Sequence, residues 1–165
     1  METNLMNEKE IIEIAKQKGF FEAAFMDVKD LVIVPEYRKY CEENLCGCYN
    51  KVAACPPQSG TVAEMTERVL KHKRALVLQT LCDTDFKGDP EGAKEGKKNH
   101  NMLADQLINE LWPDKEGILR MTAGPWKGNS CMSAYCVDVQ KMADHVGMVG
   151  WANDGKCRFF SQILL

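Results

Sequence analysis

The run Ala75-Leu76-Val77-Leu78-Gln79-Thr80-Leu81 is the stretch that decides the fold, because it is short and almost unbroken in apolar residues. A run of this length without a polar face is typical of a strand that is buried on both sides. Such a strand needs other elements packed against both faces of its sheet. We therefore expect a central strand here, with helical segments before and after it in the chain.

Helical segments are predicted where apolar residues recur at spacings of three and four. One is expected between an Asn7 cap and Gly19, and another runs from a capping box at Thr61 to about Lys73. Further apolar stripes predict helices over 104–111 and 139–146. The polar stretch 83–96, which contains glycine and proline, is expected to be a loop.

Strands are predicted in four further segments that are rich in apolar, aromatic or β-branched residues. These are 20–28, 31–34, 117–123 and 157–165. Helices that alternate with strands indicate an α/β fold, with a single mixed sheet of four to five strands and about four packing helices. The length of 165 residues predicts one domain, 1–165, with a cysteine-rich loop at about 41–57.

Composition narrows the class of protein. The net charge of -3 provides no positively charged surface for nucleic acid. No apolar run approaches the roughly 18 residues that a membrane span requires, and residues 1–13 lack the apolar core of a signal peptide. We therefore expect a cytoplasmic protein without a nucleic-acid or membrane partner. In that reducing compartment, its eight cysteines predict metal binding or thiol chemistry rather than disulfides.

Four of the eight cysteines fall within fifteen residues: Cys41, Cys46, Cys48 and Cys55. The segment has no apolar period, so these thiols are not explained as core residues. An irregular loop can direct several sulfurs to one point, and an iron–sulfur cluster takes about four thiolates. Cys41 and Cys46 resemble one zinc hook, but the other two do not form a second one. Because Cys55 is followed by proline, as in ferredoxin cluster motifs, the loop favours an iron–sulfur cluster, with zinc as the alternative.

The remaining cysteines and the three histidines are expected to be structural or surface residues. They are Cys82, Cys131, Cys136, Cys157, His72, His100 and His145. Cys82 keeps one alternative, because it ends the central strand and a strand end can present a fourth ligand. Arg38, Lys39 and Lys51 flank the loop cysteines, where they either offset the charge of a thiolate cluster or are solvated.

The segment 37–57 resembles a bacterial and archaeal family of predicted metal-binding proteins, a domain of unknown function whose hallmark is similar to C-x(4)-C-x-N-Y-G-K followed by C-P-P. The matching positions are Cys41, Cys46, Tyr49, Lys51, Cys55, Pro56 and Pro57. Weaker similarity continues through 74–80 and through 132–139 to the last strand. The resemblance implies a metal site without an established activity.

Two departures from the family pattern affect that site. Cys48 stands where the family has asparagine, and Asn50 stands where it has glycine, so Cys48 is an additional candidate ligand. Many members also carry a second, ferredoxin-like cysteine run before the last helix, and this run is missing here. If the family builds its cluster from both segments, this chain is a shortened relative with a partial or empty site.

The first functional hypothesis is a metal-binding or iron–sulfur protein that uses Cys41, Cys46, Cys55 and the additional Cys48. It would hold an iron–sulfur cluster, such as [4Fe–4S], or zinc. Its role would be electron transfer with a redox protein partner, or assistance to an anaerobic redox enzyme.

Two other hypotheses follow from the same residues. In the second, the protein is a thiol-based redox enzyme or sensor, in which Cys46 or Cys48 is the nucleophile and Lys51 or Arg38 stabilises its thiolate. In the third, it is a structural or binding domain with a vestigial metal site. The sequence assigns no catalytic residue, substrate or oligomeric state.

Overall fold

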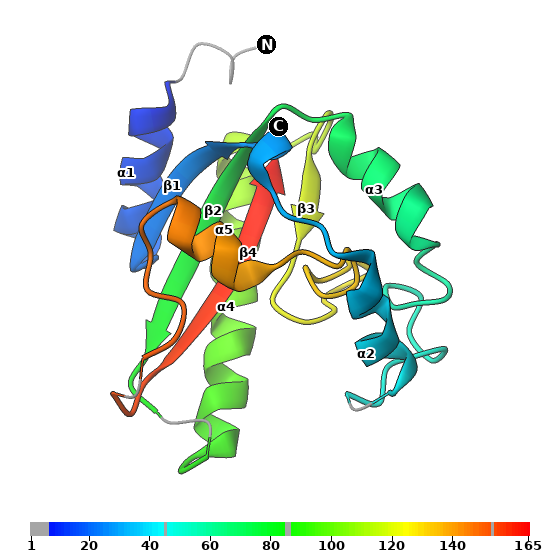
Figure 1. Ribbon diagram of the computed structural model, residues 1–165. Coiled ribbons are helices and arrows are strands. Elements are labelled where there is room, and N and C mark those ends of the chain that lie inside the picture. The colour runs from blue at the N-terminus through cyan, green and yellow to red at the C-terminus, as the bar shows by residue number, and fades with distance from the viewer. Residues whose placement is uncertain (1–6, 45, 85–86, 153) are drawn as a thin grey trace.

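The computed structural model describes residues 7–44, 46–84, 87–152 and 154–165. Four strands form one sheet in the order β1-β2-β4-β3, with helices on both faces (Figure 1). The strands are β1 (Glu22–Asp27), β2 (Arg74–Cys82), β3 (Leu119–Met121) and β4 (Cys157–Leu164). The α/β class and the four-stranded sheet are confirmed. All three strand pairings are antiparallel, where a mixed sheet was expected.

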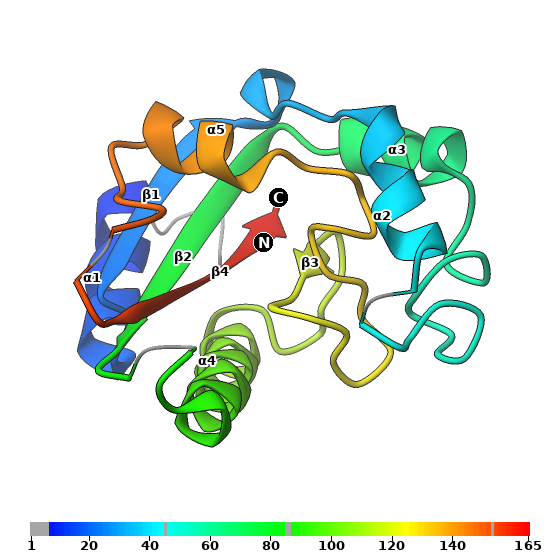
Figure 2. The ribbon, with the colours of Figure 1, turned by 60° about the horizontal axis from the view of Figure 1, so that its bottom comes forward.

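The described residues also form five α-helices. They are α1 (Glu8–Lys18), α2 (Arg38–Glu42), α3 (Val62–Leu70), α4 (Pro90–Leu111) and α5 (Val139–His145). Two 3-10 turns, η2 (Val28–Asp30) and η3 (Pro35–Tyr37), precede α2. Figure 2 shows α4 on one side of the sheet and α5 on the other. None of the helices within the described ranges is both long and apolar enough to cross a membrane.

The core lies on both faces of β2, as the apolar run predicted. Leu76 and Leu78 pack with α1 and α4, whereas Ala75 and Val77 pack with α3 and α5. All four side chains are fully buried. Burial of a leucine side chain contributes about 1.5–3 kcal/mol relative to leaving it exposed, so β2 is the element on which both layers depend.

The predicted helix starts are confirmed by their caps. The Asn7 side chain accepts a hydrogen bond from the Glu10 amide at 2.9 Å. Thr61 and Glu64 form the reciprocal capping box before α3. Asp138 caps α5 in the same way, because its side chain accepts from the Lys141 amide at 3.0 Å. These short polar motifs satisfy backbone donors that the first turn of a helix leaves open.

Helix α4 begins at Pro90, so the expectation of a loop over 83–96 was wrong for its second half. Asp89 caps the helix by accepting from the Gly92 amide at 3.0 Å, and proline is well tolerated in a first helical turn. Gly96 allows α4 to approach the sheet, because a Cβ at this position would lie 2.8 Å from the Cys82 sulfur. The glycines that suggested a loop serve close packing instead.

The segment 31–34, expected as a strand, forms only an isolated bridge between Ile33 and Val137. Pro35 follows it directly and starts the 3-10 turn η3, which ends the extended conformation. The predicted strand at 117–123 is also shorter than expected, because β3 pairs with β4 over three residues only. The early end of β3 determines where the cavity described below is located.

His100 is a buried structural residue of α4 that connects two strands. Its Nδ1 lies 2.8 Å from the Thr80 hydroxyl on β2, and its Nε2 lies 2.7 Å from the Ser161 hydroxyl on β4. Burial lowers the pKa of His100 to about 3, so the ring is neutral at physiological pH. The ring therefore serves as a hydrogen-bonding partner for both strands.

Candidate metal centre

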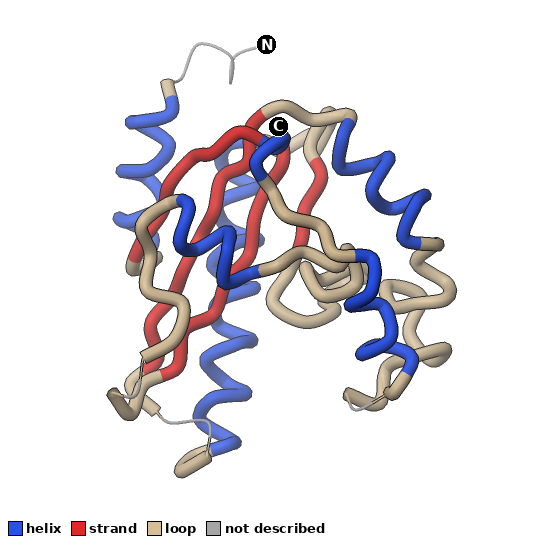
Figure 3. The backbone as a smooth tube through the Cα atoms, viewed as in Figure 1, coloured by secondary structure: helices blue, strands red, loops and turns tan. Residues whose placement is uncertain are grey.

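The four predicted ligands line one cavity of about 540 Å³. Cys41 lies in α2, and Cys46, Cys48 and Cys55 lie in the irregular loop that follows it. Figure 3 shows this loop and the segment between β3 and α5 as irregular chain beside the same edge of the sheet. The structure therefore brings the thiols of the predicted loop to a common space.

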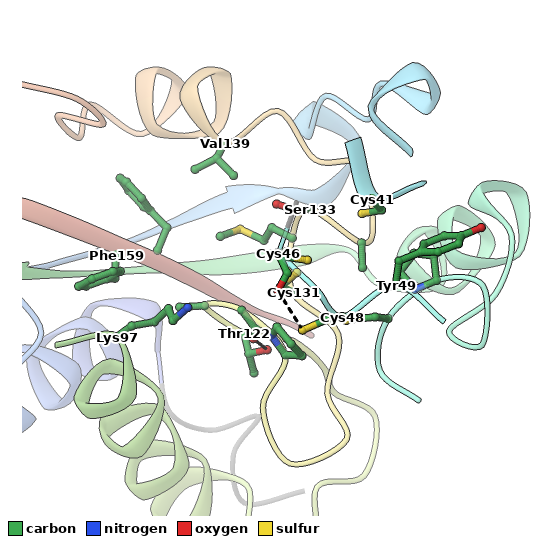
Figure 4. Close-up of a pocket in the computed structure, with 18 of the residues that line it drawn as sticks. Cys41, Cys46, Cys48, Tyr49, Lys97, Thr122, Cys131, Ser133, Val139 and Phe159 are labelled. Carbon is green, nitrogen blue, oxygen red and sulfur yellow. Dashed lines mark hydrogen bonds between the residues drawn. The ribbon is translucent and has the colours of Figure 1, made fainter. Parts of the chain in front are cut away.

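A fifth thiol, Cys131, lines the same cavity (Figure 4). It lies between β3 and α5 and was expected to be structural. The Ser130 hydroxyl donates to the carbonyl of Ala54 at 2.7 Å, which holds the residue before Cys131 against the residue before Cys55. Cys131 could not have been found from cysteine spacing, because this contact joins segments 76 residues apart.

Arg38 fixes the position of α2 relative to both cysteine-bearing segments. Its Nη1 donates to the carbonyl of Gly60 at 2.8 Å, and its Nη2 donates to the carbonyl of Ala134 at 3.1 Å. The guanidinium thus joins α2 to the end of the cysteine loop and to the segment that carries Cys131. The sequence left open whether the basic residues offset the charge of a thiolate cluster or are solvated. Arg38 is not a solvated surface residue, whereas Lys39 and Lys51 are exposed.

Burial keeps several of these thiols protonated. It raises the pKa of Cys55 to about 12, with smaller contributions from the neighbouring thiols of the cavity. Burial is also the main reason why the pKa values of Cys41 and Cys131 are raised. Negative charge on one thiol opposes ionisation of the next, and a bound cation removes that penalty because a metal-ligating thiol is deprotonated outright. The group is therefore suited to exchange its protons for a metal.

The thiols gather around the cavity without forming a finished coordination sphere. Within the described ranges, no three Cys, His, Asp or Glu side chains stand close enough together to hold a metal ion as they are placed. Five cysteines and no histidine line the cavity. This donor set suits zinc or an iron–sulfur cluster, and it does not suit calcium or magnesium, which prefer oxygen ligands.

The other cysteines lie outside this group. Cys82, the alternative fourth ligand, does not line the cavity, and its sulfur lies 3.2 Å from the Thr84 hydroxyl. Cys136 is fully buried, with its sulfur 4.0 Å from the carbonyl of Pro35. Cys157 faces Cys82 in the register of β2 and β4.

The far end of the cavity lies where β3 leaves the sheet. Continuing the register beyond the pair of Met121 and Gln162 would place Ala123 opposite Phe160. Instead, the side chain of Asn101 on α4 accepts from the Ala123 amide at 3.1 Å and donates to its carbonyl at 2.9 Å. The sheet is thereby opened at this point, and residues 122–125 and 158–160 form facing walls of the cavity.

Comparison with known proteins agrees with the metal assignment at the level of the family. The sequence profile of the family described as "Predicted metal-binding protein (DUF2284)" matches residues 24–125, which include all four loop cysteines but not Cys131. No curated protein matches the sequence.

Two solved structures superpose on this chain, and the first of them shares its fold. A selenomethionine-labelled epoxyqueuosine reductase superposes with a TM-score of 0.51 at 12% identity, covering 95% of this chain and 44% of that chain. An epoxyqueuosine reductase from Bacillus subtilis gives a TM-score of 0.48 at 12% identity, with the same coverage. The chain thus spans less than half of these proteins, and the likeness at this identity concerns the fold alone. Because the family profile matches more than half of the chain, including its cysteine-rich loop, the chain belongs to the family of predicted metal-binding proteins (DUF2284).

Proposed function

We propose that the protein binds an iron–sulfur cluster, or alternatively zinc, through the thiols that line the cavity. The proposed ligands are Cys41, Cys46, Cys55 and Cys131, with Cys48 as the alternate. The observation that carries the proposal is the convergence of five cysteines from two distant segments on one space. Membership of a predicted metal-binding family supports it independently.

An iron–sulfur cluster is the better fit of the two. Five cysteines and no histidine, aspartate or glutamate line the cavity, and Cys55 is followed by proline, as in ferredoxin cluster motifs. A cluster, when bound, supplies one-electron transfer at a potential that burial and hydrogen bonds to its sulfurs adjust. The chain's own part is to bind the cluster, release the thiol protons and keep water away from one side. The role that follows is electron transfer or assistance to a redox enzyme.

Metal analysis of protein purified and reconstituted without oxygen tests the proposal. We expect iron and sulfide, with a broad absorption band near about 400 nm. The Cys131→Ala variant should lose most of this signal, and the Cys136→Ala variant, whose thiol lies outside the cavity, should keep it. Zinc near one equivalent would identify a structural site. Absence of both metals after reconstitution would refute the proposal and favour a vestigial site.

Thiol-based redox chemistry is the alternative function, and the geometry limits it to two residues. The raised pKa values of the buried thiols disfavour them as nucleophiles, which leaves Cys46 and Cys48. Arg38, one of the two proposed thiolate partners, is engaged by backbone carbonyls, and Lys51 does not line the cavity. A fast-alkylating thiol in metal-free protein would support this function, and uniformly slow alkylation would exclude it.

A further inference from the structure

The cavity extends beyond the thiols to residues that carry no sulfur. Lys97 from α4, Val139 from α5 and residues 158–160 of β4 line this part (Figure 4). The volume of about 540 Å³ falls within the range of about 300–1,000 Å³ that is typical of small-molecule sites. The whole cavity, with the thiols at one end, therefore has the size of a site for a metabolite-sized molecule.

The wall formed by β4 presents backbone groups that have no partner within the described part of the chain. Arg74 and Leu165 exchange both backbone hydrogen bonds, at 3.3 and 2.8 Å, which fixes the alternation along the antiparallel ladder of β2 and β4. By that alternation, Phe160 directs its amide and carbonyl away from β2. Its strand partner on that side would be Ala123, which Asn101 holds instead. Phe160 therefore offers a backbone donor and an acceptor at the opened edge.

Lys97 supplies an unbalanced positive charge at this end. Its ammonium makes no hydrogen bond or ion pair with any residue in the described part of the chain, whereas Arg158 is paired with Asp154 at 3.0 Å. Figure 4 shows the Lys97 side chain extending toward the cavity from α4. Gly124 leaves room for it, because a Cβ at that position would lie only 3.3 Å from the lysine nitrogen. An ammonium beside an apolar wall is suited to an anionic group.

We propose that this end of the cavity binds a small organic anion. Its carboxylate or phosphate pairs with Lys97 and accepts from the backbone amide of Phe160, and its apolar body lies against Val139 and Pro125. The anion's other end then faces the thiols. This proposal rests on the proposed function only for the group that the anion's other end contacts. The residues that bind the anion do not depend on the metal.

Fluorescence titration with two matched probes tests this on the full chain, both metal-free and reconstituted. The first probe is 1-anilinonaphthalene-8-sulfonate, and the second is N-phenyl-1-naphthylamine, which has the same rings without the sulfonate. Lys97→Met should weaken binding of the anionic probe by about tenfold, the scale of one charge-assisted contact. Lys98→Met, a neighbouring exposed lysine outside the cavity lining, should leave it unchanged. The neutral probe should bind all three proteins equally.

A second variant places the probe in the cavity. Val139→Trp fills the space from the α5 side and should reduce binding of both probes, with the fold checked by circular dichroism. Equal binding of the anionic probe by wild type, Lys97→Met and Lys98→Met would overturn the proposal. If Lys97→Met instead lost its iron or zinc while probe binding stayed the same, Lys97 would be a counter-charge of the metal centre, and the anion site would be refuted while the metal proposal stood.

Discussion

Replacing Asn101 by leucine should destabilise the protein by about 2–6 kcal/mol. The Asn101 side chain is 2% exposed and satisfies both backbone groups of Ala123, which is itself buried. Leaving one buried donor or acceptor without a partner costs about 1–3 kcal/mol, so two such groups lose about 2–6 kcal/mol in all. The better helix propensity of leucine returns a few tenths of a kcal/mol. The backbone carbonyl of Asn101, which accepts from Arg120, is unaffected by the change.

Urea unfolding followed by circular dichroism measures this effect. With a slope of about 2 kcal/mol per molar urea, the midpoint should fall by about 1–3 M. The control is Asn99→Leu, at an exposed position of the same helix, which should shift stability by less than about 0.5 kcal/mol. If Asn101→Leu lost less than about 1 kcal/mol, the side chain would not be what satisfies Ala123, and the account of the opened sheet edge would fail.

Three further outcomes follow from the site and the core. Ser130→Ala removes the hydrogen bond between the two cysteine-bearing segments and should lower zinc affinity by about fivefold, or about 1 kcal/mol. The control Ser133→Ala, at an exposed hydroxyl that lines the cavity, should leave zinc affinity unchanged. Equal affinities of the two variants in a competition titration would contradict the role of Ser130. Buried thiols such as Cys55 have raised pKa values and must release protons to bind a metal, so apparent zinc affinity should rise by more than about tenfold per pH unit between pH 6 and 8. A zinc affinity that does not change with pH would mean that the thiols do not bind the metal. Because the pKa of His100 is lowered, the unfolded chain takes up a proton below pH 6.5 and the folded chain does not, so stability should fall by up to about 1.4 kcal/mol per pH unit as pH drops from 6.5 toward 3. In urea titrations, His100→Gln should remove this slope between pH 6.5 and 5. A slope that persists in the variant would belong to other groups.

The helix starts and the central strand were predictable because their signals are local. Asn7, Thr61 and Asp138 act on backbone groups within three residues, and the apolar run of β2 reports directly on its two buried faces. The start of α4 was missed because Gly92 and Gly96 were interpreted by their intrinsic flexibility. The Asp89 cap next to Gly92 is a local signal like the other caps and was overlooked. The position of Gly96 is decided by its close approach to Cys82 and Phe159, which no local pattern reveals.

The candidate site was predictable only in part, for the same reason. The loop cysteines are close in sequence, so their spacing alone indicated a shared ligand. Cys131 joins them through the contact of Ser130 with Ala54, and the cavity depends on Asn101 reaching Ala123 across 22 residues. These are long-range contacts of single side chains without a repeated pattern. They can be recognised only after the chain is folded.

The contact between Asn101 and Ala123 also changes which structural opening exposes each backbone amide to exchange with solvent. In a continued ladder, the amides of Ala123 and Phe160 would exchange with solvent in the same opening event of the sheet. Here the Ala123 proton is held by a side chain of α4, and the Phe160 amide faces the cavity. Deuterium uptake at Ala123 therefore reports on the opening of α4, whereas uptake at Phe160 reports on whether the cavity is occupied. Two positions at one sheet edge therefore report on separate events, the opening of α4 and the occupation of the cavity.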